Sequence, residues 1–309
     1  MYFPICTTTT YNKEVPYRTY VLCLWLTFVP LAKHFVPIVI GLYEPPFKSD
    51  GDTKPIDLRI RFLIEPNVRK NLQLLILVNS MPDRFKERQQ IRESWAMSDL
   101  YDNSSTRIFF LTGKPVQKQF NDIVVADIEE GYYSLSLKTY AMLYFKSTRY
   151  RMAKCLVKAD SDNVLLLRNF ERLCDETSMC DVSRRVQRER TKWMVPESIY
   201  PDDRFPQYCS TGTYVLCGYD IPMRLMHATE ESWFPHSSNY RMLPEDVLFT
   251  GIFAEKAGIR RTHIGGMSFI DAPEYFCRDV KRTYSIHMNR VQDPKNYFKR
   301  LISMEGHFC

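Results

Sequence analysis

The chain has 309 residues, of which 45% are hydrophobic and 25% are charged, a composition typical of a folded globular protein. Only 11 residues are glycine, which excludes collagen-like and glycine-linker sequences. The formal net charge of +6 is smaller than nucleic-acid-binding domains usually carry, so no nucleic acid is expected as a partner. A charge of this size also suits a substrate that carries a diphosphate group.

The N-terminal region is expected to anchor the protein in a membrane. Residues 20–43 form an apolar stretch that is long enough to cross ~30 Å of hydrocarbon, although Lys33 lies within it. Lys13 and Arg18 precede the stretch, which favours a cytosolic N-terminus. We expect four parts along the chain: a cytosolic tail at 1–19, a signal-anchor helix at 20–43, an exposed stem at 44–70 and a catalytic domain at 71–309.

The expected domain alternates between two patterns. Short apolar runs, typical of buried strands, occur at 72–78, 107–113, 123–128 and 155–159. Apolar residues at helical spacing occur at 85–95 and 135–145. Strands that alternate with helices usually form a parallel sheet covered on both faces, so we expect an α/β fold with a mainly parallel central sheet flanked by helices. Ligands of such sheets bind at the carboxyl ends of the strands.

Two aspartates directly follow the apolar run at 155–159. Asp160 and Asp162 are two residues apart, so their carboxylates could hold one divalent cation, Mg²⁺ or Mn²⁺, which would bridge to phosphate oxygens. The same D-x-D pattern is also common in turns that bind no metal. The apolar strand before it favours the metal site here.

A second acidic pair, Glu245 and Asp246, follows Pro244 and predicts the start of a helix. One of these carboxylates, kept ionised by the helix N-terminus, could accept a proton as a general base. The structural alternative is that both acids only stabilise the helix end.

Other candidate site residues stand alone in the sequence. His287 lies in an alternating run, where a histidine is either structural or a metal ligand. The basic side chains of Arg88, Lys138 and Lys158 could contact an anionic substrate, or they could belong to solvated helix faces.

The cysteines point to an oxidising compartment. None of the nine forms a C-x-x-C pair, so a zinc ribbon or a thioredoxin-like site has no support. Cys174 and Cys180 could close a short loop, but the pairing cannot be read from the sequence. Asn103 begins an N-glycosylation sequon, Asn-Ser-Ser, which also suits a secretory glycoprotein.

In this order, the motifs resemble those of the β-1,3-galactosyltransferases and β-1,3-N-acetylglucosaminyltransferases, glycosyltransferase family 31. The resemblance covers about residues 71–290, and its matching stretches are 88–95 (RQQIRESW), 110–113 (FLTG), 133–139 (YSLSLKT), 158–162 (KADSD), 208–216 and 245–251. It implies a GT-A fold, a type II Golgi membrane anchor with a lumenal catalytic domain, and an inverting reaction. It also implies a UDP-sugar donor and dependence on Mn²⁺ or Mg²⁺.

The resemblance also implies roles for single residues. Asp162 and His287 would ligate the metal, Asp160 would hold the nucleotide, and Asp246 would be the catalytic base. Arg88 and Lys138 would contact the nucleotide or have a structural role. Lys158, from its position just before the D-x-D motif, is a further candidate for contact with the nucleotide.

The expected enzyme is therefore a hexosyltransferase. It would move galactose or an N-acetylhexosamine from a UDP-sugar to a hydroxyl of an acceptor glycan, on protein or lipid, in β-1,3 linkage. Two alternatives stay open. Thr211 and Thr213 stand where the family usually has glycines, which favours an inactive GT-A-fold binding protein of the secretory pathway. Asp160 after an apolar strand also fits a haloacid-dehalogenase-like phosphatase with Asp160 as the nucleophile.

Overall fold

The computed structural model describes the greater part of the expected catalytic domain and little before it. The described residues are 55–67, 71–114, 120–131, 134–173, 182–185, 193–271, 282–288 and 293–303. The expected cytosolic tail and signal-anchor helix at 1–19 and 20–43 lie outside them. No helix in these ranges has the length and apolar character that crossing a membrane requires.

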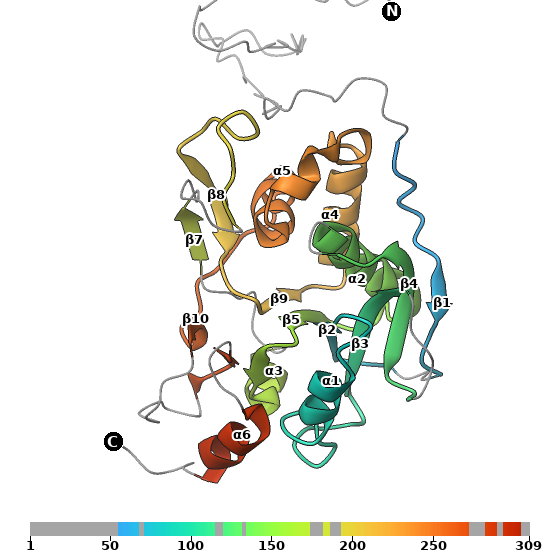
Figure 1. Cartoon of the computed structure of the whole chain (residues 1–309), viewed down its shortest axis with the longest axis vertical. Helices are drawn as coiled ribbons and strands as arrows, with labels where there is room; N and C mark the ends of the chain where they lie inside the picture. Colours follow the sequence, from blue (N-terminus) through green and yellow to red (C-terminus); the bar gives the residue numbers. More distant parts are fainter. Residues whose placement is uncertain are drawn as a thin grey trace, which may run out of the picture. The chain divides into compact units, whose positions relative to one another are not determined.

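A six-stranded sheet forms the centre of the described structure (Figure 1). In the order in which they pair, its strands are β1 (Phe62–Ile64), β4 (Ile123–Glu129), β3 (Thr106–Lys114), β2 (Leu74–Asn79), β5 (Cys155–Asp160) and β9 (Tyr214–Cys217). The four inner strands are parallel, and β1 and β9 pair antiparallel at the two edges. The expected mainly parallel α/β sheet is thus confirmed, as are the four strands that the apolar runs predicted.

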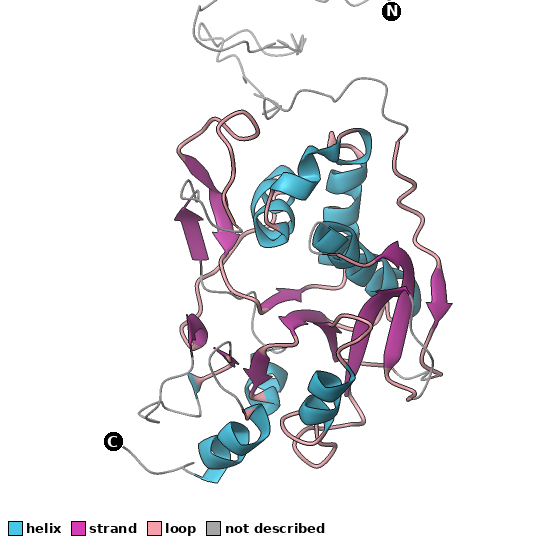
Figure 2. Ribbon diagram, viewed as in Figure 1, coloured by secondary structure: helices cyan, strands magenta, loops and turns pink. Residues whose placement is uncertain are grey.

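Helices cover both faces of this sheet (Figure 2). Alternate side chains of a strand point to opposite faces. Ile76 of β2 therefore packs in the core that holds Ile91 of α1 (Phe85–Arg92), Phe170 of α3 (Leu167–Leu173) and Phe298 of α6 (Pro294–Ser303). Burial of each such side chain stabilises the fold by about 1.5–3 kcal/mol.

The opposite face of the sheet is covered by α2 (Leu135–Arg149). There the ring of Phe109 of β3 meets the ring of Phe145 edge to face, with their centroids 6.2 Å apart. Helix α2 packs in turn on α4 (Ile221–Glu230), which packs on α5 (Phe253–Lys256). Both predicted helices, at 85–95 and 135–145, are therefore present.

A smaller sheet continues the chain after the D-x-D motif. Strand β6 (Asn163–Leu165) pairs antiparallel with β11 (Ser285–His287), which pairs parallel with β10 (Met267–Asp271). A separate antiparallel pair joins β7 (Val182–Arg185) and β8 (Arg204–Cys209). Two 3-10 turns, η2 (Phe234–His236) and η3 (Ser238–Met242), precede a π-helical turn, η4 (Val247–Ile252), that runs into α5.

The boundary expected between stem and domain at residue 71 is wrong. Residues 62–64, assigned to the stem, form β1 and pair with β4, and Leu58 is buried. Apolar residues alternate with mostly polar ones over 56–64, IDLRIRFLI, which is the pattern of a half-buried strand. The prolines before this segment suggested an exposed stem, and the alternation was the signal that was missed.

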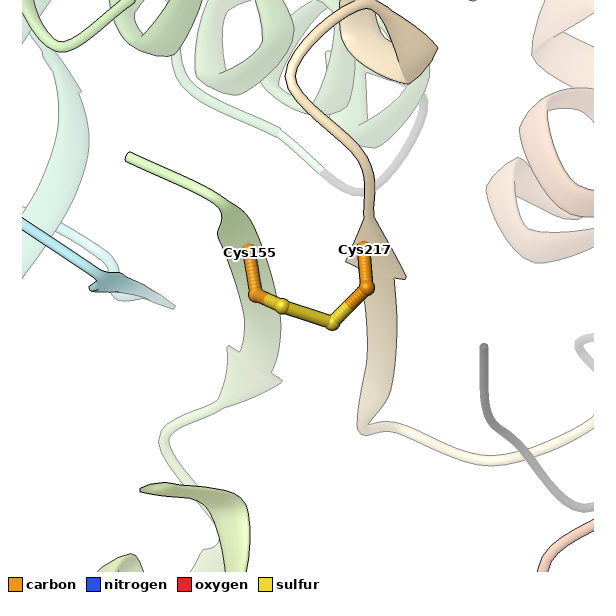
Figure 3. Close-up of a disulfide and its surroundings, with 2 residues drawn as sticks. All are labelled: Cys155 and Cys217. Carbon is orange, nitrogen blue, oxygen red and sulfur yellow. A yellow bond between two sulfur atoms is a disulfide. The ribbon is translucent and has the colours of Figure 1, made fainter. Parts of the chain in front are cut away.

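A disulfide between Cys155 and Cys217 joins the neighbouring strands β5 and β9 (Figure 3). The two cysteines are direct partners in the register of the strands, and 62 positions separate them in sequence. Closing a loop of this length stabilises the folded state by about 4 kcal/mol in the chain-entropy description. Cys209 is disulfide-bonded as well. Cys174 and Cys180 lie outside the described residues.

Candidate active site

The D-x-D motif lies at the carboxyl edge of the parallel sheet, where the sequence predicted it. Asp160 is the last residue of β5 and stands opposite Asn79, the last residue of β2. The amide Nδ2 of Asn79 is 3.5 Å from Asp160 Oδ1. Three neighbouring parallel strands end at this edge, which is the usual ligand-binding position in an open α/β sheet.

Strand pairing brings His287 beside Asp162, although the two are 125 positions apart in sequence. Residue 163 begins β6 and pairs with His287 in β11, and the backbone N–H of Met288 donates to the carbonyl of Asp162 over 2.7 Å. As a result, His287 Nε2 lies 3.3 Å from Asp162 Oδ2. Burial acts against ionisation of Asp162, but its hydrogen bond to His287 holds the pKa of the carboxyl below its ordinary value.

This pair suits a divalent cation. A carboxylate oxygen and an imidazole nitrogen are ligands that Mn²⁺ accepts, and both side chains are partly exposed. In the part of the chain that the structure describes, no three His, Cys, Asp or Glu side chains gather into a metal site. Water or phosphate oxygens could add further ligands to a cation that Asp162 and His287 hold.

Behind the D-x-D turn, Lys158 is buried between two carboxylates. Its Nζ lies 2.8 Å from Asp160 Oδ1 and 2.6 Å from Glu245 Oε1, and only 4% of its side chain is exposed. Burial disfavours the charged ammonium, but the two carboxylates outweigh it and raise the pKa of Lys158. Burial also raises the pKa of Asp160, against the effect of Lys158.

The second acidic pair begins a helical segment, as predicted, but its two members differ. Glu245 accepts hydrogen bonds at Oε2 from Thr139 Oγ1 of α2, over 3.1 Å, and from the hydroxyl of Tyr214 of β9, over 3.3 Å. Together with Lys158 at Oε1, these donors engage both oxygens of Glu245.

Asp246 is the N-cap of η4, and its Oδ1 accepts from the N–H of Val247 over 2.8 Å. The sequence suggested that a helix N-terminus keeps this carboxylate ionised. Instead, burial and the neighbouring charge of Glu245 raise the pKa of Asp246 to about 7, against the effects of Lys158 and of the Val247 hydrogen bond. Desolvation of a carboxylate disfavours its charged form more than one backbone hydrogen bond favours it.

Arg88 and Lys138 hold the loop that follows β2. Arg88 donates to Ser80 Oγ over 2.9 Å and to the carbonyl of Pro82 over 3.0 Å. Lys138 Nζ donates to the carbonyl of Ser80 and to Glu130 Oε1, each over 2.8 Å. Both side chains are buried, so these contacts support the structural role that was the alternative for Arg88 and Lys138. Direct contact with a nucleotide stays a prediction for both, and also for Lys158.

The segment with the two unexpected threonines packs against the D-x-D turn. The N–H of Asp160 donates to the carbonyl of Gly212 over 3.0 Å. A Cβ added to Gly212 would lie 2.9 Å from Asp160 Oδ2 and 2.8 Å from Asn163 Nδ2, so any other residue would have to displace these side chains. Thr211 and Thr213 are buried, and the Thr211 hydroxyl donates to the carbonyl of Thr213. The glycine that this contact requires is therefore present between them.

Two residues that shape the site, Glu245 and Gly212, were not assigned a role from the sequence. Glu245 stands beside the expected base, Asp246. The local sequence does not indicate which of the two carboxylates is engaged by donors from other segments. Gly212 is a lone glycine between threonines, and close approach to a carboxylate from another segment leaves no mark in the local sequence.

Comparison with known proteins agrees with these motifs. The family model described as Galactosyltransferase matches residues 86–265, which include the D-x-D motif and Asp246. Human β-1,3-galactosyltransferase 1 is 28% identical over 263 residues, 76% of this chain and 77% of the relative. β-1,3-galactosyltransferase 5 of Pan paniscus is 30% identical over 256 residues, 74% of this chain and 80% of the relative.

A solved glycosyltransferase involved in glycosylation of the major capsid of PBCV-1 shares 10% identity, with a TM-score of 0.37, over 75% of this chain and 98% of the other. A likeness this distant carries no argument about the fold. The family match and the sequence relatives show the family: the chain belongs to the galactosyltransferase family, and it is a glycosyltransferase.

Proposed function

We propose that this glycosyltransferase is an inverting, metal-dependent enzyme with a GT-A fold. It transfers galactose or an N-acetylhexosamine from a UDP-sugar to a hydroxyl of an acceptor glycan on protein or lipid, in β-1,3 linkage. One observation carries the proposal: at the carboxyl edge of one sheet, Lys158 binds both Asp160, in the turn that carries Asp162 beside His287, and Glu245, which directly precedes Asp246. The printed names of the relatives, β-1,3-galactosyltransferases, support the linkage and the galactosyl donor.

On the donor side, Asp162 and His287 would hold Mn²⁺ or Mg²⁺. When bound, the cation supplies positive charge that offsets the charge developing on the departing diphosphate. Asp160 stands beside Asp162 and is proposed to hold the nucleotide. Its backbone N–H is already fixed by Gly212, so the carboxylate is presented from a rigid turn.

On the acceptor side, Asp246 is proposed to take the proton from the attacking hydroxyl. A base works best when its pKa lies near the working pH, and the pKa of Asp246, raised to about 7, meets that condition. A single displacement with inversion needs one such carboxylate to act on the attacking group, because the diphosphate leaves without a protein acid. Binding both substrates in reacting position supplies much of the remaining rate.

The two alternatives have less support. Family membership leaves the phosphatase hypothesis without support. The inactive-protein hypothesis rested on Thr211 and Thr213. Both side chains are buried, and Gly212 keeps the close approach to Asp160 that a side chain would prevent.

The proposed location is the Golgi membrane, with a type II anchor at 20–43 and the catalytic domain in the lumen. The Cys155–Cys217 disulfide supports it, because disulfides persist in oxidising compartments. Asn103 of the sequon is exposed in a turn before β3, so a lumenal domain can be glycosylated there. If peptide-N-glycosidase does not change the mobility of the expressed chain, and Asn103→Gln has no effect either, the lumenal location loses this support.

The experiment that tests the proposed function is a donor screen. Full-length protein in detergent is incubated with Mn²⁺, with UDP-galactose, UDP-N-acetylglucosamine or UDP-N-acetylgalactosamine, and with a mixture of glycan acceptors. UDP release that depends on the acceptor and on the metal is the expected result. Binding of UDP with Mn²⁺ in calorimetry, without transfer from any donor, would support the inactive-protein hypothesis instead.

A further inference from the structure

The ammonium of Lys158 is placed where a charge is costly unless it is paired. Lys158 lies inside β5, between β2 and β9, with 4% of its side chain exposed. Side chains alternate along a strand, so it points away from the core that holds Val157 and Ala159, toward the face covered by α2. An unpaired ammonium in such a position would be strongly destabilising, and Lys158 has two carboxylate partners.

The two partners belong to different halves of the proposed site. Asp160 begins the turn that carries Asp162, which stands beside His287. Glu245 directly precedes Asp246, the proposed base. Lys158 Nζ also lies 3.4 Å from the carbonyl of Gly212, which accepts from the N–H of Asp160. One ammonium therefore touches the D-x-D turn, the loop beside it and the start of η4.

Glu245 is fixed by this contact and by two others. Thr139 of α2 and Tyr214 of β9 donate to its second oxygen. Without the ammonium, the carboxylates of Asp160, Glu245 and Asp246 would lose the positive charge that Asp160 and Glu245 share. Like charges in a poorly solvated site repel or take up protons, and either outcome would move the start of η4 or neutralise the base.

From this geometry we infer that Lys158 is a positioning residue: it joins Asp160 and Glu245 in one ionic cluster and so sets the base Asp246 at a fixed place relative to the donor-binding turn. The inference rests on the proposed function, because it concerns the two halves of that site. A displacement of about 1 Å between reacting groups can lower the rate by about 10²-fold. A link that prevents such a displacement can therefore offset the free-energy cost of burying a charge.

Two substitutions separate the contribution of the charge at position 158 from that of the side-chain shape. Lys158→Met removes the ammonium and keeps the length of the side chain. Lys158→Arg keeps a positive charge and changes the shape of its head. Lys146→Met is the matched control, because Lys146 is also a buried lysine, but its Nζ donates to the carbonyl of Tyr219, away from the site. The double variant Lys158→Met/Glu245→Gln removes one charge of each sign and covers the case in which Lys158→Met does not fold.

The expected result is a fall of about 10²-fold in kcat for Lys158→Met, with a smaller fall for Lys158→Arg. Each variant is measured with the donor and acceptor that the wild-type protein uses. The double variant is expected to recover part of the kcat lost in Lys158→Met, because it leaves no unpaired Glu245 charge. Lys146→Met is expected to lower the stability of the protein and to keep its kcat.

The pH profile gives a readout that a purely structural role would not move. The charged and titratable groups that affect Asp246 are Glu245 beside it, Lys158 and Asp160 of β5, and Tyr214 of β9. Lys158→Met removes the one positive charge among them, so the acid limb of the kcat profile should move up by about 1 pH unit or more. Glu245→Gln removes a negative charge, so its acid limb should move down.

The inference is overturned if Lys158→Met keeps the wild-type kcat and acid limb. Where Lys158→Met does not fold, it is overturned if the double variant keeps the wild-type kcat. It is also overturned if Glu245→Gln and Lys158→Met move the limb in the same direction. Failure of the proposed function looks different: the wild-type protein itself then releases no UDP from any donor, before any variant is compared.

Discussion

The Asp162–His287 pair and the cluster around Lys158 lie on two sides of one turn, yet they are built in opposite ways. Asp162, in the turn before β6, and His287, at the end of β11, are partly exposed and contact each other over 3.3 Å. Lys158 is buried, only 10% of the Glu245 side chain is exposed, and both are engaged by several protein groups. A partly exposed pair suits a cation that arrives with its substrate, whereas a pre-formed cluster suits a group that must stay in place during the reaction.

The largest effect is expected at the base. Asp246→Asn removes the proton acceptor and keeps the shape of the side chain, so transfer should fall by about 10²- to 10⁴-fold. Binding of UDP with Mn²⁺, measured by calorimetry, should not change, because Asp246 is not among the proposed metal ligands. Normal transfer by Asp246→Asn would show that another group is the base.

A substitution in the exposed pair should affect the metal first. His287→Ala removes one of two proposed protein ligands, so the Mn²⁺ concentration for half-maximal activity should rise by more than about tenfold. His227→Ala on α4 is the control, because His227 is exposed and pairs with Glu231 of the same segment. An unchanged Mn²⁺ dependence in His287→Ala would remove this histidine from the proposed metal site.

The buried cluster should also set the pH dependence. Burial and Glu245 raise the pKa of Asp246 to about 7, and a base must be deprotonated to act. Below about pH 7, kcat should therefore fall roughly tenfold for each pH unit, and above it kcat should level off. A steady-state profile from pH 5 to 9 measures this, and a flat profile through pH 7 would contradict the assignment of Asp246.

The smallest effect is expected where the two regions touch. Gly212→Ala places a Cβ 2.9 Å from Asp160 Oδ2, which should lower the free energy of unfolding by about 1–3 kcal/mol. Urea denaturation of the purified protein measures the change. Gly265→Ala is the matched control, because an added Cβ there meets nothing within 4 Å. Equal stability of both variants would mean that the loop moves aside without cost.

Much of the fold could be predicted because the relevant patterns are local. Apolar runs such as 72–78 and 155–159 are the inner strands of a sheet that is buried on both faces, and such strands read as continuous hydrophobic segments. Strand β1 was assigned to a stem because the prolines before it outweighed its alternating pattern. Strand β1 is a short edge strand, and its pairing with β4 makes it part of the sheet.

The candidate site was predictable residue by residue, and less so as an arrangement. Asp162, His287 and Asp246 were each named from local motifs and from the family resemblance. Lys158 was expected to meet a nucleotide, and its partners turned out to be Asp160 and Glu245. A lysine has the same signature in sequence whether its ammonium faces a ligand or a protein carboxylate, because the choice depends on which segment packs above it.

The sequence by itself determined the inner strands, the main helices, the acidic motifs and the family, since each depends on neighbouring residues or on their order. Tertiary structure alone decided three things: that His287 lies beside Asp162, that Glu245 is bound by Lys158, and that the pKa of Asp246 is raised. The physical reason is common to all three. Charge pairing and desolvation depend on distances across the fold, and no local pattern contains those distances.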